Sequence, residues 1–308
     1  MSSPVASKAS ELKIPLRFDV PLSRYSTFKI GGPARYFSEP TCLEELEALL
    51  TFARNEGLPV LTIGKGSNLL FPDEGFPGLV ITLIHFEPNK LLFDQEWKTV
   101  TASSGVNLYR LALACRDQGF GGTEFLSHVP GTVGGAVMMN AGFSRIPGQK
   151  KEIGDLLEEV AVLTAAGEVK RFRREALDFS YRRSHLDGLI ILEARLKLSK
   201  ADPEEIQAEI QASFDYRNQV QDLRYPSAGS VFKNPAGQQG SSGQLIEKSG
   251  LKGKRIGGAM ISDRHANFMV NVESARASDV TELIALAQKK VFENFGIKLE
   301  LEIRIIKK

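Results

Sequence analysis

Two glycine-rich stretches carry the first chemical signal in this sequence. Residues 129–142 contain four glycines among small and apolar residues, without a single charge: Gly131, Gly134, Gly135 and Gly142. Glycine lets a backbone approach a ligand closely and point successive N–H groups at it. This pattern suits a pyrophosphate, because main-chain donors can meet its charge without Lys or Arg. The simpler interpretation is a glycine-loosened turn before a buried helix, and composition alone favours it.

A second glycine loop, residues 64–68 (GKGSN), strengthens the case for a dinucleotide. It follows the apolar run Val60–Ile63 but matches neither common nucleotide motif. A Rossmann turn needs a third glycine that opens a helix, whereas Pro72 forbids an extended helix here. A P-loop needs Gly-Lys-Ser/Thr after an earlier glycine, and neither Lys65 nor Lys254 has that setting. The two loops together indicate a nucleotide site of another kind more strongly than either loop alone.

Three further segments hold side chains that could do chemistry. They are residues 179–184 (FSYRRS), residues 225–235 (YPSAGSVFKNP) and the alternating run 299–306 (LELEIRII). Taken alone, they predict a polar edge strand or loop, an irregular ordered turn whose serines bond local N–H groups, and a strand with exposed carboxylates. The four histidines lack metal-ligand spacing, so no metal site is expected and each is interpreted as a satisfied surface or half-buried residue. No nucleophile elbow is present, which argues against hydrolysis.

Hydrophobic periodicity predicts the elements that must position these segments. Expected strands are residues 34–38, 60–63, 79–83, 98–103, 159–164, 168–172, 192–198 and 299–305. Expected helices begin after Thr41, at Asn107, at Pro203 and at Val280. Thr41 and Glu44 have the spacing of a capping box, and Asp202 is a typical N-cap before Pro203. The last helix should end at Gly296.

With these elements in place, several motifs resemble the UDP-N-acetylenolpyruvoylglucosamine reductase (MurB) family. They are residues 27–34 (TFKIGGPA), the GKGSN loop, residues 122–125 (GTEF) leading into VPGTVGGAVMMNAG, then GSVFKNP and LELEIRII. The resemblance covers the chain from about residue 25 onward. It implies an α+β fold in three parts, with a non-Rossmann FAD-binding domain of the vanillyl-alcohol-oxidase (PCMH) type and a C-terminal α+β substrate domain. The expected parts are residues 21–86 (with 299–308) and 87–200 for FAD and residues 203–298 for substrate.

The resemblance also implies the reaction, which is NADPH-dependent, FAD-mediated reduction of UDP-N-acetylglucosamine enolpyruvate to UDP-N-acetylmuramate in peptidoglycan precursor synthesis. Arg182 would hold the substrate carboxylate, Ser230 would give a proton to the substrate carbon, and Glu302 would be the second catalytic group. The expected FAD contacts are Gly64, Lys65, Gly66, Ser67, Asn68, Pro130, Gly131, Thr132, Gly134, Gly135, Ala136 and Asn140. The expected substrate contacts are Tyr181, Lys233 and Asn234.

Two segments depart from the family pattern. Residues 143–148 (FSRIPG) stand where Ala-Tyr-Gly and an acidic residue are usual, which would reshape a loop over the flavin. Residues 221–223 read Gln-Asp-Leu in place of Gln-Pro-Leu with a nearby lysine, so no lysine contact to a phosphate is expected there. The spacing from Ser230 to Glu302, 302 − 230 = 72 positions, resembles the type II subgroup.

Composition limits the alternatives. The 308 residues carry a net charge of +2, too little for nucleic acid to be the main partner. The sequence shows no apolar leader and no 18-residue apolar run, which predicts a cytoplasmic protein without membrane insertion, and Cys42 and Cys115 are interpreted as core residues of helices. Two alternatives stay open: another FAD-linked oxidase or dehydrogenase on the same scaffold, and a catalytically inactive nucleotide-binding module. A UDP-sugar is the expected partner, and the oligomeric state is left open.

Overall fold

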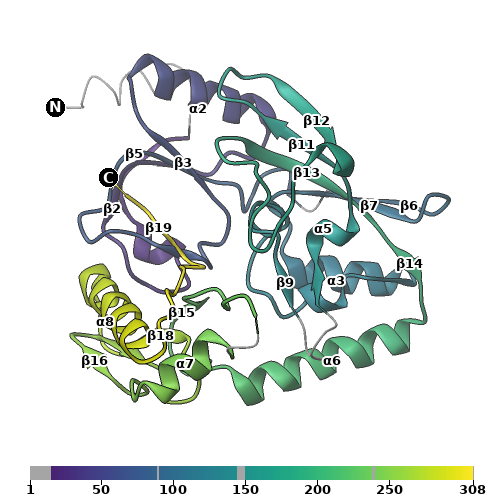
Figure 1. The fold of residues 1–308 in the computed structure, drawn as a ribbon. Coiled ribbons are helices and arrows are strands. Elements are labelled where there is room, and N and C mark those ends of the chain that lie inside the picture. Colours follow the sequence, from purple (N-terminus) through teal and green to yellow (C-terminus); the bar gives the residue numbers. More distant parts are fainter. Residues whose placement is uncertain (1–14, 89, 144–149, 238–239, 308) are drawn as a thin grey trace. The chain divides into compact units, whose positions relative to one another are not determined.

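The computed structural model describes residues 15–88, 90–143, 150–237 and 240–307, in which helices and strands are mixed along the chain (Figure 1). No helix in these ranges is long and apolar enough to cross a membrane. The chain forms two compact units. The first comprises the described residues up to Arg17 with residues 37–65 and 78–217, and the second comprises residues 18–36, 66–77 and those from 218 onward. Compactness thus divides the chain differently from the three functional parts expected above, which remain a proposal.

The first unit contains a five-stranded antiparallel sheet. Its strands, in spatial order, are β12 (Val169–Arg173), β11 (Leu157–Leu163), β13 (Ile190–Lys197), β7 (Thr99–Ser103) and β6 (Leu91–Asp94). One hydrophobic core joins this sheet to α3 (Leu108–Asp117) and α4 (Val133–Met138). The strands expected at residues 159–164 and 168–172 are confirmed, and β11 and β12 pair antiparallel as a hairpin. Cys115 lies fully buried in α3, as expected.

The alternation of residues 192–198 predicts a half-buried strand, but Glu193, on the polar face of β13, is buried. That residue is 8% exposed. Its carboxylate pairs with Lys90 Nζ (2.8 Å) and with Arg171 Nη2 (2.8 Å). These two cations lower the pKa of Glu193 against the opposing effect of burial. Period-two alternation therefore predicted the strand correctly but not the ion pairs that cover its second face.

A second sheet has the strand order β1 (Arg17–Pro21), β2 (Pro33–Ser38), β5 (Phe76–Thr82) and β3 (Val60–Ile63), with β3 and β5 parallel. The expected Thr41–Glu44 capping box of α2 (Leu43–Asn55) is wrong. Cys42 is the N-cap, so it precedes the helix and is not part of its core. The Glu45 carboxylate, one turn inside, accepts from the backbone N–H (2.7 Å) and the hydroxyl (3.1 Å) of Thr41.

Shorter elements connect these parts. They are β8 (Phe120–Gly121) paired with β14 (Ser199–Lys200), β9 (Gly142–Phe143) paired with β10 (Lys151–Glu152), α5 (Ile153–Leu156), α6 (Pro203–Val220), and the 3-10 turns η1 (Leu22–Tyr25), η2 (Glu124–Leu126) and η3 (Arg174–Ala176). The predicted start of α6 is confirmed, because Asp202 Oδ1 accepts from Glu204 N (2.7 Å). Asn107 caps α3 through hydrogen bonds from Tyr109 N and Arg110 N.

The second unit packs two helices on a small antiparallel sheet. The sheet order is β15 (Ser227–Ser230), β18 (Phe268–Asn271), β17 (Ala259–Ile261) and β16 (Arg255–Ile256), and the helices are α7 (Ser242–Lys248) and α8 (Ala277–Phe295). Gly296 ends α8 in the left-handed conformation, as predicted. A parallel pair, β4 (Leu69–Leu70) with β19 (Arg304–Ile305), completes the unit.

Two sequence expectations in this unit are wrong. Residues 225–235 were expected to be irregular, but they contain β15, which pairs with the distant β18. Residues 299–305 were expected to form one strand, but only Arg304–Ile305 does so. The N–H groups of Glu302 (2.8 Å) and Ile303 (3.4 Å) both donate to the Val231 carbonyl, which interrupts a regular ladder. The alternation of buried apolar residues still holds, since Leu299 and Ile303 are buried.

Candidate active site

The loop at residues 64–68 turns its carbonyl groups into the protein. The pairs are Gly64 O with Thr82 Oγ1 (3.3 Å), Gly66 O with Thr27 N (3.4 Å) and Asn68 O with Arg304 N (2.9 Å). The N–H groups of Lys65, Gly66 and Ser67 meet no acceptor among the residues that the structure describes. Lys65 is exposed, but Gly66 is buried and Ser67 half-buried, and N–H groups of such residues are normally paired, so this loop is suited to an anionic ligand.

Glycine is required at two positions of this loop. Gly66 has φ +63°, and a Cβ there would lie 2.0 Å from the Tyr25 carbonyl oxygen. A Cβ on Gly64 would lie 2.5 Å from Thr132 Oγ1, so the first loop lies directly against the second glycine stretch. Gly64, at the start of the first loop, is therefore a neighbour of the second stretch within the first unit.

The second stretch has both open and paired N–H groups. Those of Gly131 and Thr132 meet no acceptor among the described residues. The N–H groups of Val133 and Gly134 donate to Val106 O and Ser104 O (both 2.9 Å), and that of Gly135 donates to Thr132 Oγ1 (3.4 Å). Glycine at 134 is needed for packing, because a Cβ there would lie 2.8 Å from Ser104 Cβ. Main-chain N–H groups without an acceptor among the described residues thus occur in both stretches, at residues 65–67 and at residues 131–132.

Buried polar atoms without a partner gather around the second stretch. Ser104 Oγ, Ser127 Oγ and both ring nitrogens of His128 meet no hydrogen-bond partner among the described residues. Ser104 contacts Gly134, while Ser127 and His128 precede Pro130 in the chain. Buried polar groups are almost always satisfied, so these atoms fit a polar ligand such as a flavin dinucleotide. Sequence reasoning missed both serines, because nothing local distinguishes them from serines in a turn.

His128 was expected to be a satisfied histidine, and this is wrong. The residue is 3% exposed, and its ring packs edge-on against Phe143 at 4.0 Å between centroids. Burial, together with the nearby charge of Arg217, lowers the pKa of His128 to about 4. The imidazole is therefore neutral at pH 7, with one donor and one acceptor available to a ligand.

Arg182 is directed at the end of the second glycine stretch. Its Nη1 donates to Asn140 O (3.4 Å) and its Nη2 to Gly142 O (3.0 Å). The side chain is 17% exposed, and its Nη1 lies 4.0 Å from Glu152 Oε1. Tyr181 stands beside it, with the Arg182 guanidinium carbon 5.2 Å from the ring centroid and Lys150 Nζ 3.9 Å from the same point. We call Asn140, Lys150, Glu152 and Arg182 the arginine node.

The side chain of Asn140 is engaged inside the protein. Its Nδ2 donates to Glu152 Oε2 (2.9 Å) and Ser180 O (3.0 Å), and its Oδ1 accepts from Gly154 N (3.1 Å). An amide side chain can make four such bonds, so one acceptor position is left. The structure thus joins this predicted cofactor residue to the predicted catalytic Arg182.

In the second unit, the residue after Ser230 is hydrogen-bonded to the main chain of Glu302. Val231, which follows Ser230, accepts a hydrogen bond from Glu302 N (2.8 Å). Glu302 O in turn accepts from Asn68 Nδ2 (3.0 Å), so the first glycine loop is bonded to the same strand end. Three segments that are far apart in sequence are held together here by a main-chain hydrogen bond and a bond from the Asn68 side chain.

Asn267 fixes the chain just after Ser230, and sequence reasoning missed it. Its Oδ1 accepts from Phe232 N (2.9 Å) and its Nδ2 donates to Phe232 O (2.8 Å), while its own carbonyl accepts from Val231 N (2.8 Å). Lys233 N donates to Glu300 O (2.8 Å), and Asn234 Oδ1 accepts from Ser242 N (3.1 Å). Both predicted substrate residues therefore follow directly on this rigid segment.

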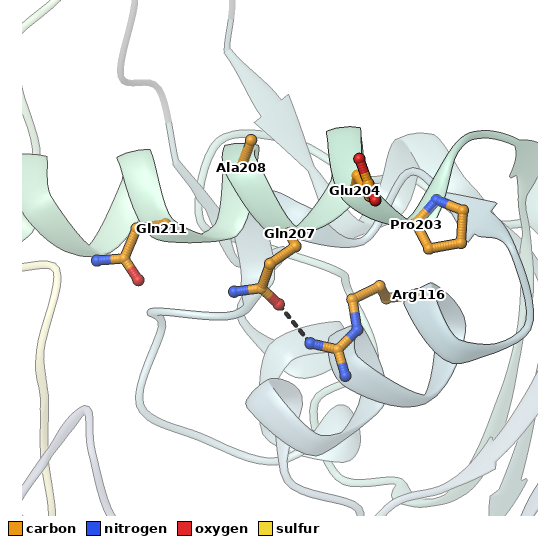
Figure 2. A pocket seen from close by; sticks show the side chains of 6 residues that line it. All are labelled: Arg116, Pro203, Glu204, Gln207, Ala208 and Gln211. Atoms are coloured by element: carbon orange, nitrogen blue, oxygen red, sulfur yellow. Dashed lines mark hydrogen bonds between the residues drawn. The ribbon is translucent and has the colours of Figure 1, made fainter.

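A surface hollow elsewhere in the first unit contains none of the predicted site residues. Figure 2 shows it on α6 beside Arg116 of α3, with a volume of about 510 Å³. Arg116 is hydrogen-bonded there to Gln207. The hollow is wide open, whereas ligand sites are usually enclosed, so it is not the candidate site. Among the described residues, no three His, Cys, Asp or Glu side chains are placed to hold a metal ion.

Comparisons with known proteins cover nearly the whole chain. A family model of the UDP-N-acetylenolpyruvoylglucosamine reductase C-terminal domain matches residues 221–306, and an FAD binding domain model matches residues 34–173. The UDP-N-acetylenolpyruvoylglucosamine reductase of a Synechococcus species is 41% identical over 306 residues, which is 98% of this chain and 95% of that protein. That of Lactobacillus johnsonii is 41% identical over 297 residues, which is 96% of each.

A solved structure agrees with these relatives. The crystal structure of UDP-N-acetylenolpyruvylglucosamine reductase (MurB) from Thermus caldophilus matches with a TM-score of 0.77 at 37% identity, over 96% of this chain and 99% of that chain. The α+β fold and the PCMH-type FAD-binding domain expected from sequence are confirmed. The chain belongs to the UDP-N-acetylenolpyruvoylglucosamine reductase family, and it is a flavin-dependent oxidoreductase of peptidoglycan precursor synthesis.

Proposed function

We propose that Arg182, Ser230 and Glu302 carry the reduction of UDP-N-acetylglucosamine enolpyruvate to UDP-N-acetylmuramate, with NADPH as the electron donor. The observation that carries this proposal is the bonding of the Glu302 main chain to Val231 O and to Asn68 Nδ2, which joins the segment after Ser230, the segment of Glu302 and the first glycine loop. Bound FAD would supply the hydride chemistry, which no amino-acid side chain can perform.

The FAD would be held by both glycine stretches. The open N–H groups of Lys65, Gly66 and Ser67 would meet the pyrophosphate. The remaining contacts that we propose come from Gly64, Asn68, Pro130, Gly131, Thr132, Gly134, Gly135, Ala136 and Asn140. Of the residues added by the structure, Ser104, Ser127 and His128 have buried polar atoms that need a partner. In this proposal, residues 21–86 and 87–200 serve FAD, and residues 203–298 serve the substrate.

Arg182 would bind the carboxylate of the enolpyruvyl group. Its guanidinium offers two parallel donors, a geometry that matches a carboxylate. Negative charge grows on that carboxylate as the double bond is reduced, so a fixed cation stabilises the transition state more than the ground state. The low exposure of the Arg182 side chain (17%) strengthens this effect, because little water screens the charge.

Ser230 would donate the proton that completes the reduction at the neighbouring carbon, and Glu302 would be the second catalytic group. Proton transfer from a positioned group contributes roughly 10²–10⁴ in rate. Hydrogen bonds at Val231 from Glu302 and to Asn267 limit the movement of the Ser230 segment. Tyr181, Lys233 and Asn234 would contact the UDP-sugar. For Asn234 the contact would come through Nδ2, since its Oδ1 caps α7.

The proposal is tested with purified protein under anaerobic conditions. We expect a flavin absorbance band, its bleaching by NADPH, and its return when UDP-N-acetylglucosamine enolpyruvate is added, with UDP-N-acetylmuramate found by mass spectrometry. Bleaching without return would indicate another FAD-linked oxidoreductase, and the absence of a flavin band would indicate an inactive nucleotide-binding module. Soluble NADPH and a UDP-sugar also place the proposed reaction in the cytoplasm.

A further inference from the structure

Glu152 occupies the centre of the arginine node. Its Oε2 accepts from Asn140 Nδ2 (2.9 Å), and its Oε1 pairs with Lys150 Nζ (2.5 Å). The same oxygen lies 4.0 Å from Arg182 Nη1, which is too far for a hydrogen bond. Lys150 and Asn140 thus hold the carboxylate close to the Arg182 guanidinium, whose Nη1 and Nη2 donate to the carbonyls of Asn140 and Gly142.

Two residues of the node have strained backbones. Asn140 has φ +43° and Arg182 has φ +59°, in the left-handed region that non-glycine residues seldom adopt. Such conformations persist only where the surroundings enforce them, and they concentrate at functional sites. The three hydrogen bonds of the Asn140 side chain supply that enforcement, because one of them reaches Ser180, two residues before Arg182.

The surrounding glycines leave no room for the node to relax. A Cβ on Gly142 would lie 2.4 Å from Lys151 O, and one on Gly154 would lie 2.8 Å from Asn140 Oδ1. The two carbonyl groups that receive the Arg182 guanidinium, those of Asn140 and Gly142, are therefore fixed by close packing. The node is built tightly around one arginine.

We propose that Glu152 and Asn140 are positioning residues for Arg182. Asn140 fixes the backbone on both sides of the hydrogen bond from Arg182, at residue 140 itself and at Ser180. The charge of Glu152 orients the guanidinium toward the place where a carboxylate would bind. This inference rests on the proposed function, in which Arg182 binds the enolpyruvyl carboxylate. Neither Glu152 nor Asn140 needs to touch the substrate for this role.

The test separates the two half-reactions in three variants of the FAD-loaded enzyme. Glu152→Ala should slow flavin reoxidation by the enolpyruvyl UDP-sugar about 100-fold, because a displaced reacting group costs about this much. Glu152→Gln keeps an acceptor for Asn140 but loses the charge, and should slow it about tenfold. Glu159→Ala is the matched control, since Glu159 is also 17% exposed and pairs with Arg171 and Arg195. It should leave reoxidation unchanged.

Flavin reduction by NADPH and FAD content should stay at parent levels in all three variants. A loss of both half-reactions together in Glu152→Ala would show that Glu152 only supports the fold, and would overturn the inference. Parent-like reoxidation in Glu152→Ala would overturn it as well.

A second readout does not depend on turnover. The Arg182 Nε–H signal in a ¹⁵N–¹H spectrum, assigned by its loss in Arg182→Lys, should shift in Glu152→Ala and not in Glu159→Ala. An unshifted signal would overturn the positioning role even if the parent enzyme reduces the UDP-sugar. The signal could also shift in Glu152→Ala while the UDP-sugar fails to reoxidise the parent enzyme. That result would overturn the proposed function and support the positioning role.

Discussion

The arginine node and the Ser230–Glu302 segment hold their reactive groups by opposite means. In the node, side chains do the positioning: Asn140 and Glu152 fix Arg182, and two residues accept strained backbone conformations. Around Ser230 it is the main chain that is held, through bonds of Val231 with the main chains of Glu302 and Asn267 and bonds of Phe232 with the Asn267 side chain. A guanidinium on a long flexible side chain needs lateral support, whereas a serine hydroxyl is only two bonds away from Cα and is positioned largely by its backbone. The length of the reactive side chain therefore decides which kind of support the chain must supply.

The largest effect is expected from Ser230→Ala. The variant keeps the main-chain bonds of its segment, so flavin reduction by NADPH should be unchanged while reoxidation by the enolpyruvyl UDP-sugar falls about 10³-fold. Stopped-flow absorbance of the flavin measures both steps. Ser227→Ala, in the same strand β15, is the control and should behave as the parent. Turnover of Ser230→Ala at the parent rate would show that another group delivers the proton.

Asn267→Ala tests the main-chain side of the comparison. It leaves the buried N–H and carbonyl of Phe232 without partners, which should lower the free energy of unfolding by about 2–4 kcal/mol. Urea denaturation measures this, with the more exposed Asn294→Ala, which loses only a bond to Ser249, as the control. A loss below about 0.5 kcal/mol would mean that the segment is held without Asn267.

Arg182→Ala tests the side-chain side. Reoxidation should fall about 10²-fold, because the charge that stabilises the developing carboxylate is lost. Arg182→Lys should recover only part of it, since an ammonium lacks the two-donor edge. The neighbouring Arg183 is exposed, so Arg183→Ala should match the parent. If Arg182→Ala is reoxidised at the same rate as Arg183→Ala, Arg182 has no more part in the reaction than a surface residue.

The smallest effect is expected in the acid stability of the two units, which should be lost at different pH values. His128 has a folded pKa of about 4 against 6.5, so the unfolded chain binds a proton first and stability falls as the pH drops from 6.5 to 4. Between pH 7 and 5 this costs about 2 kcal/mol. In the second unit, the Arg224 and Ser262 partners lower the pKa of Asp222 to about 2 from 3.8, so its stabilisation is lost only between pH 3.8 and 2.

Hydrogen exchange followed by mass spectrometry measures this acid response for each unit. Peptides around His128 should lose protection at higher pH than peptides around Asp222. The variant His128→Phe should remove the loss of protection around His128 and keep the loss of protection around Asp222. Simultaneous loss in both units of the parent protein would contradict the expected order.

Local signals explain which parts of the fold were predictable. Asn107, the Asp202–Pro203 pair and Gly296 mark helix ends by chemistry within one turn, and all three were predicted correctly. The wrong predictions involve partners distant in sequence. Strand β15 exists because β18 pairs with it, and the run 299–303 is not a strand because Val231 captures two of its N–H groups.

The same distinction applies to the candidate site. The identities of Arg182, Ser230 and Glu302 came from a family resemblance, and their roles stay predictions. The supporting residues could not be read from the sequence, since Glu152 and Asn267 act through contacts formed only after folding. The buried Ser104, Ser127 and His128 were invisible for the same reason: burial without a partner has no sequence signature.

The discontinuous second unit has a consequence for synthesis on the ribosome. Residues 66–77 emerge early, but β4 finds its partner β19 only at residues 304–305, and Asn68 finds Glu302 only then. More than 200 residues must be translated between the glycine loop at residues 64–68 and the segment that holds it, residues 302–305. We therefore expect a nascent chain that stops short of residue 302 to retain flavin poorly. Stable binding of the cofactor would then require the full-length chain.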